Sequence, residues 1–141
     1  MIPTWRPFVL LLALVALVGA CSAGGAAATP PTRTIDVITT DEMRYEPATY
    51  DFAVGDRVLF RVQNTGKLVH EFFVGTAADQ TTHETEMQAG HSMHNHTNSV
   101  SVEPGQTQTL ELTFARAGTL EVGCHVPGHW DAGMRGTITV R

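Results

Sequence analysis

The chain has 141 residues, of which 43% are hydrophobic and 16% are charged, a balance that allows one domain with a real core and argues against wholesale disorder. Its net charge is −5 and it contains no run of Lys or Arg, so a nucleic-acid-binding function is not expected. Its only cysteines are Cys21 and Cys124, which excludes a disulfide-dense scaffold and a four-cysteine zinc or iron–sulfur site.

The amino-terminal residues 1–21 predict an export signal. Arg6 precedes an apolar run over residues 8–20, which is shorter than the roughly 20 residues that span a bilayer. The run ends in Leu17-Val18-Gly19-Ala20-Cys21, which resembles a bacterial lipobox. We therefore predict that Cys21 is lipidated and tethers the exported protein to a membrane, with a plain secretory signal as the alternative.

The remainder is predicted to be a flexible linker followed by one domain. Residues 22–33 are rich in Gly, Ala and Pro and carry no large apolar side chain, as is typical of a tether. Within residues 34–141, short alternating or β-branched segments recur between turn signals. These eight expected strands cover residues 35–39, 49–52, 57–62, 68–74, 100–102, 107–114, 119–124 and 137–140. Their spacing predicts an all-β, antiparallel Greek-key sandwich.

One long segment interrupts the pattern of strands. Residues 75–98 contain no Val, Ile, Leu or aromatic residue but hold four of the seven histidines. A structureless segment of this length inside a compact domain is usually functional or disordered. We expect a His/Met-rich loop here.

The strongest chemical signal is Cys-x4-His-x4-Met, formed by Cys124, His129 and Met134 after the expected strand 119–124. A fourth ligand has to come from elsewhere, and His70 is the candidate because it lies in an otherwise apolar strand, where an unpaired imidazole is costly. One thiolate, two imidazoles and a thioether form the type 1 blue-copper set. Zinc accepts Cys and His but rarely Met, so copper is the expected metal.

Residues 34–141 resemble the cupredoxins, the small blue copper proteins of the plastocyanin and azurin kind. The motifs that carry the resemblance are Phe52-Ala53-Val54-Gly55-Asp56-Arg57-Val58, Asn64-Thr65-Gly66 and His70, then Glu103-Pro104-Gly105, Phe114, Gly118 and the Cys-x4-His-x4-Met loop. The resemblance implies a type 1 copper site in a Greek-key sandwich, and is greatest to exported cupredoxins linked to bacterial copper tolerance. Glu71 stands where many cupredoxins carry an Asn that braces the cysteine loop.

Other polar residues offer less specific signals. The loop carries a candidate second, labile copper site, whose thioethers suit Cu(I), with a merely solvated loop as the alternative. Its candidate ligands are His83, Met87, His91, Met93, His94 and His96. We expect His125 not to bind metal, although histidines beside the cysteine bridge to a second copper cluster in multicopper oxidases. Trp130 is expected either in a docking patch beside His129 or in the core.

These observations support two functions and disfavour a third. The first is one-electron transfer by a monomeric, lipid-tethered envelope protein that cycles between Cu(I) and Cu(II), with a redox protein as its partner. The second is capture of excess envelope copper by the same site and the His/Met loop, with a copper-handling protein as partner. A truncated copper oxidase or a nitrite-reductase-like enzyme is disfavoured because the chain is short and lacks the required histidine set. We therefore expect no enzymatic activity.

Overall fold

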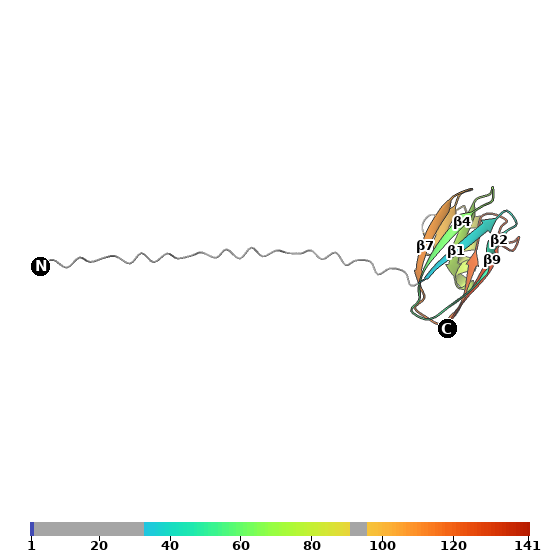
Figure 1. The fold of residues 1–141 in the computed structure, drawn as a ribbon. Coiled ribbons are helices and arrows are strands. Elements are labelled where there is room, and N and C mark those ends of the chain that lie inside the picture. The colour runs from blue at the N-terminus through green and yellow to red at the C-terminus, as the bar shows by residue number, and fades with distance from the viewer. Residues whose placement is uncertain (2–32, 91–95) are drawn as a thin grey trace.

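The structure is a computed structural model that describes Met1, residues 33–90 and residues 96–141. The described part contains nine strands and one helix (Figure 1). In chain order these are β1 (Arg33–Thr40), β2 (Arg44–Glu46), β3 (Thr49–Phe52), β4 (Arg57–Asn64), β5 (His70–Gly75), α1 (Ala77–Gln88), β6 (Ser99–Val102), β7 (Thr107–Thr113), β8 (Gly118–Gly123) and β9 (Arg135–Val140). The predicted signal, the lipidation of Cys21 and nearly all of the predicted linker lie outside the described residues.

The strands form two sheets, which confirms the predicted β-sandwich. One sheet has the order β2-β1-β4-β7 and the other β3-β9-β8-β5-β6. The sheets are mixed rather than antiparallel throughout, because β1 pairs with β4 and β3 pairs with β9 in parallel. Alternating hydrophobicity reports which face of a strand is buried but not its direction, so the sequence pattern carried no sign of these parallel pairs.

The core lies between the sheets and is largely aromatic. Phe52 and Phe114 stack with ring centroids 4.7 Å apart, while Phe60 and Phe72 lie 5.1 Å apart at a tilt. Apolar burial of this kind is the main stabilising contribution to the fold. Tyr45, the centre of the short strand β2 that the sequence analysis missed, packs edge-on against Phe72 and donates a hydrogen bond to the carbonyl of Glu71.

The prediction of a loop over residues 75–98 is wrong for its first half, which is helix α1. The helix begins at a capping box, in which the Thr76 hydroxyl accepts from the Asp79 amide and the Asp79 carboxylate accepts from the Thr76 amide. The helix contacts the sandwich mostly through polar side chains, since its buried residues are Gln80, His83 and Met87. Hydrophobic periodicity therefore gave no signal for this helix, and the Thr-x-x-Asp spacing at its start is the signal that could have revealed it.

Candidate metal centre

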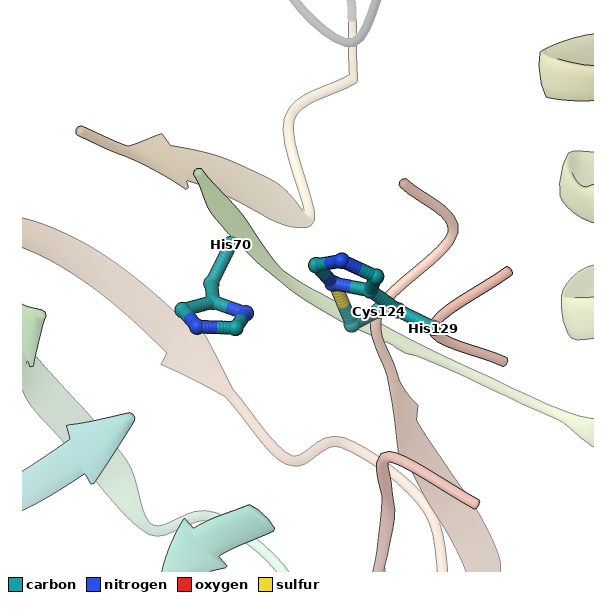
Figure 2. Close-up of side chains that lie close together, drawn as sticks. All are labelled: His70, Cys124 and His129. Carbon is teal, nitrogen blue, oxygen red and sulfur yellow. The ribbon is translucent and has the colours of Figure 1, made fainter. Parts of the chain in front are cut away.

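The structure brings three of the four predicted ligands together at one end of the sandwich. His70 begins β5, Cys124 follows β8 directly, and His129 lies in the loop that leads to β9. One potential ligand atom from each lies within 4.8 Å of the others, and Figure 2 shows the three side chains converging from separate segments. They meet because β5 and β8 are antiparallel neighbours, with Phe73 opposite Gly123.

Backbone hydrogen bonds close the loop that carries the later ligands. The Cys124 amide donates to the carbonyl of Met134 at 3.2 Å, and the Met134 amide donates to the carbonyl of His129 at 3.0 Å. Gly128 and Gly133 take left-handed φ angles of 87° and 90°, which a residue with a Cβ adopts only with strain. Met134 itself is fully buried and belongs to the same core cluster as Cys124. The loop is thus folded tightly around the candidate ligands.

The Cys124 sulfur lies in an environment that disfavours its ionisation in the absence of a cation. Burial raises the pKa of the thiol to about 12, although the Glu71 amide, which donates to Sγ at 3.3 Å, acts in the opposite direction. His129 Nδ1 lies 3.3 Å from the same sulfur. A metal ion bound here has to displace the thiol proton, as thiolate coordination requires.

The surroundings of His70 are the observation that most favours a metal site. The residue is fully buried, and neither of its ring nitrogens has a hydrogen-bond partner among the described residues. Burial, with a further contribution from His129, lowers the pKa of His70 and favours the neutral ring. An unpartnered buried imidazole is costly, and a soft metal ion beside the sulfur would satisfy it. The donor set therefore fits copper.

The turn that delivers His70 is held by two side chains. Asn64, fully buried, donates to the carbonyls of Leu68 at 2.7 Å and Val102 at 2.8 Å, and accepts from the Gly66 amide. The Asp41 carboxylate accepts from the amides of Lys67 and Leu68, and these bonds lower the pKa of Asp41. A Cβ on Gly66 would lie 2.1 Å from the Asp41 carboxylate, so a larger residue there would displace this carboxylate from its bonds to the turn.

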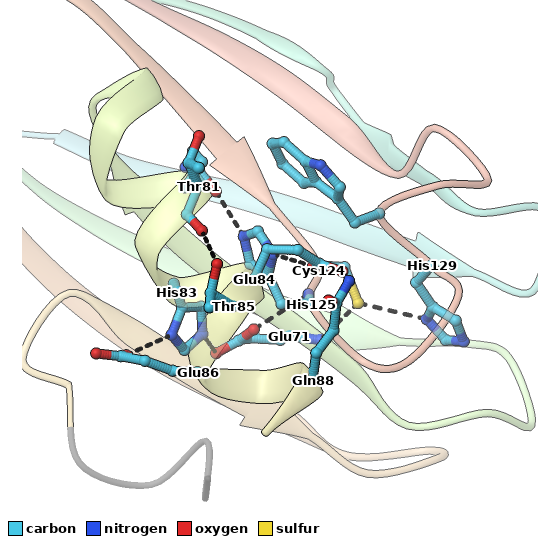
Figure 3. A network of polar contacts seen from close by, with 12 residues as sticks. Glu71, Thr81, His83, Glu84, Thr85, Glu86, Gln88, Cys124, His125 and His129 are labelled. Atoms are coloured by element: carbon cyan, nitrogen blue, oxygen red, sulfur yellow. Dashed lines mark hydrogen bonds and ion pairs between the residues drawn. The ribbon is translucent and has the colours of Figure 1, made fainter. Parts of the chain in front are cut away.

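Glu71 stabilises the cysteine loop from the position at which many cupredoxins carry an Asn. Its fully buried carboxylate accepts from the His125 amide at 3.2 Å and lies 2.8 Å from the His83 ring, while its own amide donates to the Cys124 sulfur (Figure 3). Burial raises the pKa of Glu71 despite His83. The residue links the cysteine loop to helix α1, a role that its sequence position alone did not indicate.

Both ring nitrogens of His125 have hydrogen-bond partners. Its Nδ1 lies 2.7 Å from the Glu84 carboxylate and its Nε2 lies 2.7 Å from Oε1 of Gln80. The Trp130 ring stacks on His125 with centroids 4.6 Å apart, and the Arg135 guanidinium lies over the Trp130 ring, 3.8 Å from its centroid. Trp130 is half-buried and contacts both of these side chains.

Only part of the predicted second copper site lies within the described residues. His83 and His96 come together, and Glu86, which was not among the candidate ligands, joins them. Met87 is buried on α1 and does not lie in an exposed loop. The other candidates, His91, Met93 and His94, lie outside the described residues.

Comparisons with known proteins agree with this geometry. The family described as copper-binding proteins of the plastocyanin/azurin family matches residues 33–141. The copper-resistant cuproprotein CopI of Rubrivivax gelatinosus is 39% identical over 77% of this chain and 67% of its own length. CopI of Pseudomonas aeruginosa is 36% identical over 82% of this chain and 80% of its own length.

A solved structure shows the same fold. Reduced auracyanin from Roseiflexus castenholzii superposes with a TM-score of 0.68 and 20% identity, and the match covers 79% of this chain and 99% of that one. From the family match, the CopI relatives and the shared fold we conclude that the chain belongs to the plastocyanin/azurin family of copper-binding proteins, the cupredoxins.

Proposed function

We propose that the protein is a type 1 copper protein that transfers one electron at a time, with His70, Cys124, His129 and Met134 as the copper ligands. The observation that carries this proposal is the buried cluster of two imidazoles and one thiol. Neither ring nitrogen of His70 has a hydrogen-bond partner among the described residues, and the Asp41 carboxylate lies 3.8 Å from its Nε2. Copper bound there supplies the Cu(I)/Cu(II) couple. We propose Met134 as the fourth copper ligand. It is buried, and its backbone forms hydrogen bonds with the backbones of Cys124 and His129.

The protein's contribution to electron transfer is a rigid ligand frame that excludes water. His70 and Cys124 are fully buried, and His129 is 7% exposed. Asn64 and Asp41 hold the turn before His70, and Glu71 holds the cysteine loop. A frame that keeps its shape in both oxidation states keeps the reorganisation on electron transfer small. Electrons would leave through His129, the most exposed of these three side chains.

The proposed setting is copper tolerance in the bacterial cell envelope. The two CopI relatives are named as copper-resistant cuproproteins. The amino-terminal sequence has the features of an export signal, and lipidation at Cys21 would hold the protein at a membrane. Among the described residues, no helix is both long and apolar enough to cross a membrane. Capture of excess copper by the same centre is the second candidate function, and the names of these relatives favour it.

The proposed partner is a redox protein for the carrier, or a copper-handling protein for the capture function, with the protein itself a monomer. We propose no substrate chemistry and hence no enzymatic role. The histidine next to the cysteine, which would bridge to a second copper cluster in an oxidase, is instead bonded to Glu84 and Gln80.

Voltammetry combined with a chelator challenge separates the two functions. An electron carrier gives a reversible one-electron wave and retains its copper against a Cu(I) chelator and a Cu(II) chelator alike. A capture protein releases copper to a chelator in one oxidation state. A protein with no reversible wave that loses copper on each change of oxidation state would contradict the electron-transfer proposal.

A further inference from the structure

A second cluster of metal-binding side chains lies on the other side of Glu71. His83 and Glu86 of α1 and His96, before β6, each place one potential ligand atom within 4.8 Å of the others. His83 Nδ1 and His96 Nε2 lie 3.7 and 3.8 Å from the same Glu86 oxygen. Two ligand atoms at about 2.1 Å from one tetrahedral ion lie about 3.4 Å apart, so these separations are close to those of a loaded site.

The His83 ring is oriented for coordination. Its Nε2 lies 2.8 Å from the buried Glu71 carboxylate, and the tautomer that donates a hydrogen bond from Nε2–H to this carboxylate has its lone pair on Nδ1. His83 is 2% exposed, and its Nδ1 has no hydrogen-bond partner among the described residues. A ligating histidine that gives its other N–H to a carboxylate is the common arrangement in metal sites.

Packing fixes the ring further and leaves a route for an ion. The His83 ring stacks on Phe73 with centroids 4.2 Å apart and an interplanar angle of 10°. A cavity of about 270 Å³ opens at the cluster and is lined in addition by Asp79, Thr82 and Asn98. The side chains of Glu86 and His96 are 38% and 33% exposed, so an ion from solvent reaches them directly.

We propose that His83, Glu86 and His96 form a second metal site that binds Cu(II). Two imidazoles and a carboxylate suit Cu(II) or Zn(II), and Cu(II) binds more tightly to such a set. Cu(I), which prefers sulfur ligands, is not the expected ion at these three residues. This proposal differs from the sequence-based hypothesis of a labile Cu(I) site, and it does not depend on whether the Cys124 centre carries electrons or stores copper.

The test is a Cu(II) titration of protein already loaded with one equivalent at the Cys124 centre. We expect a second equivalent, with an electron paramagnetic resonance signal split by two imidazole nitrogens and no new thiolate absorption. His96→Ala and Glu86→Gln should each weaken this second binding at least tenfold while the visible absorption of the first centre stays unchanged. Thr82→Ala, which alters the same cavity without removing a ligand, is the matched control and should bind as the wild type does.

Three results would overturn the proposal. The first is a wild-type protein that takes no second equivalent. The second is a second equivalent that binds equally well to the His96→Ala and Glu86→Gln variants, which would place it elsewhere on the chain. The third is a site that retains Zn(II) against an equal concentration of Cu(II), which would refute the assignment of the metal.

Discussion

The replacement Asn64→Ala tests how the fold delivers His70 to the metal centre. Asn64 ends β4 and is fully buried, and its side-chain amide bonds to the backbone at three places in the turn and in β6. The backbone amide of Asn64 donates to Gln106, and its carbonyl accepts from Gly105. These two bonds remain in the variant, so the strand itself should persist.

The magnitude of the effect follows from the backbone groups that lose a partner. The carbonyls of Leu68 and Val102 and the amide of Gly66 each lose one hydrogen bond of 2.7 to 2.9 Å. A lost hydrogen bond costs about 1 kcal/mol, and more where the remaining group stays buried. Leu68 is exposed and water replaces its partner at small cost, so the expected loss is about 2–3 kcal/mol of the free energy of unfolding.

Urea denaturation of the copper-free protein measures this loss, and Asn98→Ala is the matched control. The Asn98 side chain donates one hydrogen bond, to the carbonyl of Val74, so its removal should cost only about 1 kcal/mol. Copper affinity provides the second measurement. Asn64→Ala removes the hydrogen bonds that hold the turn before His70. Because loss of the residues that orient a metal ligand weakens metal binding, we expect copper binding at the Cys124 centre to weaken about tenfold. Asn98→Ala should leave copper binding at this centre unchanged.

Equal destabilisation by the two variants would show that Asn64 is not the brace of the turn. Unchanged copper affinity in Asn64→Ala, with the expected loss of stability, would show that His70 is positioned by other contacts such as those of Asp41. Either result would refute the reasoning that connects this buried amide to the metal centre.

Three further predictions concern the centre itself. Cys124→Ser should abolish the intense visible absorption of the copper protein while circular dichroism shows the fold retained; full colour in this variant would disprove the ligand assignment. Met134→Leu removes a donor atom from the copper. Because each donor stabilises the more highly charged Cu(II) more than Cu(I), the reduction potential measured by voltammetry should rise. An unchanged or lower potential would argue against Met134 as a copper ligand. Gly123→Ala should lower the free energy of unfolding by about 1–3 kcal/mol, since its Cβ would lie 2.4 Å from Gln80 and 2.6 Å from Trp130. Wild-type stability of this variant in urea would contradict the close packing of α1 against the end of β8.

The sequence was most informative about the strands with alternating buried and exposed residues and about the residue types that bind copper. The sandwich followed from β-branched and alternating segments, and β4 shows why, since Val58, Phe60 and Val62 are buried between more exposed neighbours. The candidate copper ligands followed from residue type, because few metals other than copper suit a thiol, two imidazoles and a thioether. The structure adds that His70, Cys124 and His129 converge.

The parts that sequence reasoning missed are those stabilised by polar contacts or by long-range pairing. Helix α1 packs through Gln80 and His83, so it lacks an apolar face. Strand β2 is three residues long and has a single buried side chain, Tyr45. The bracing role of Glu71 depends on His83 and His125, which are 12 and 54 residues away in the chain and come close only in the folded protein.

The most direct test of the central claim is a Cu(II) titration of the purified protein, followed by visible absorption and by bound metal per chain in both oxidation states. We expect an intense thiolate-to-copper band that saturates at one equivalent, even if the protein binds further metal ions elsewhere. Reduction should bleach this band while the copper stays in place. A protein that binds copper without this band at any ratio would contradict the assignment of His70, Cys124, His129 and Met134 as the copper ligands.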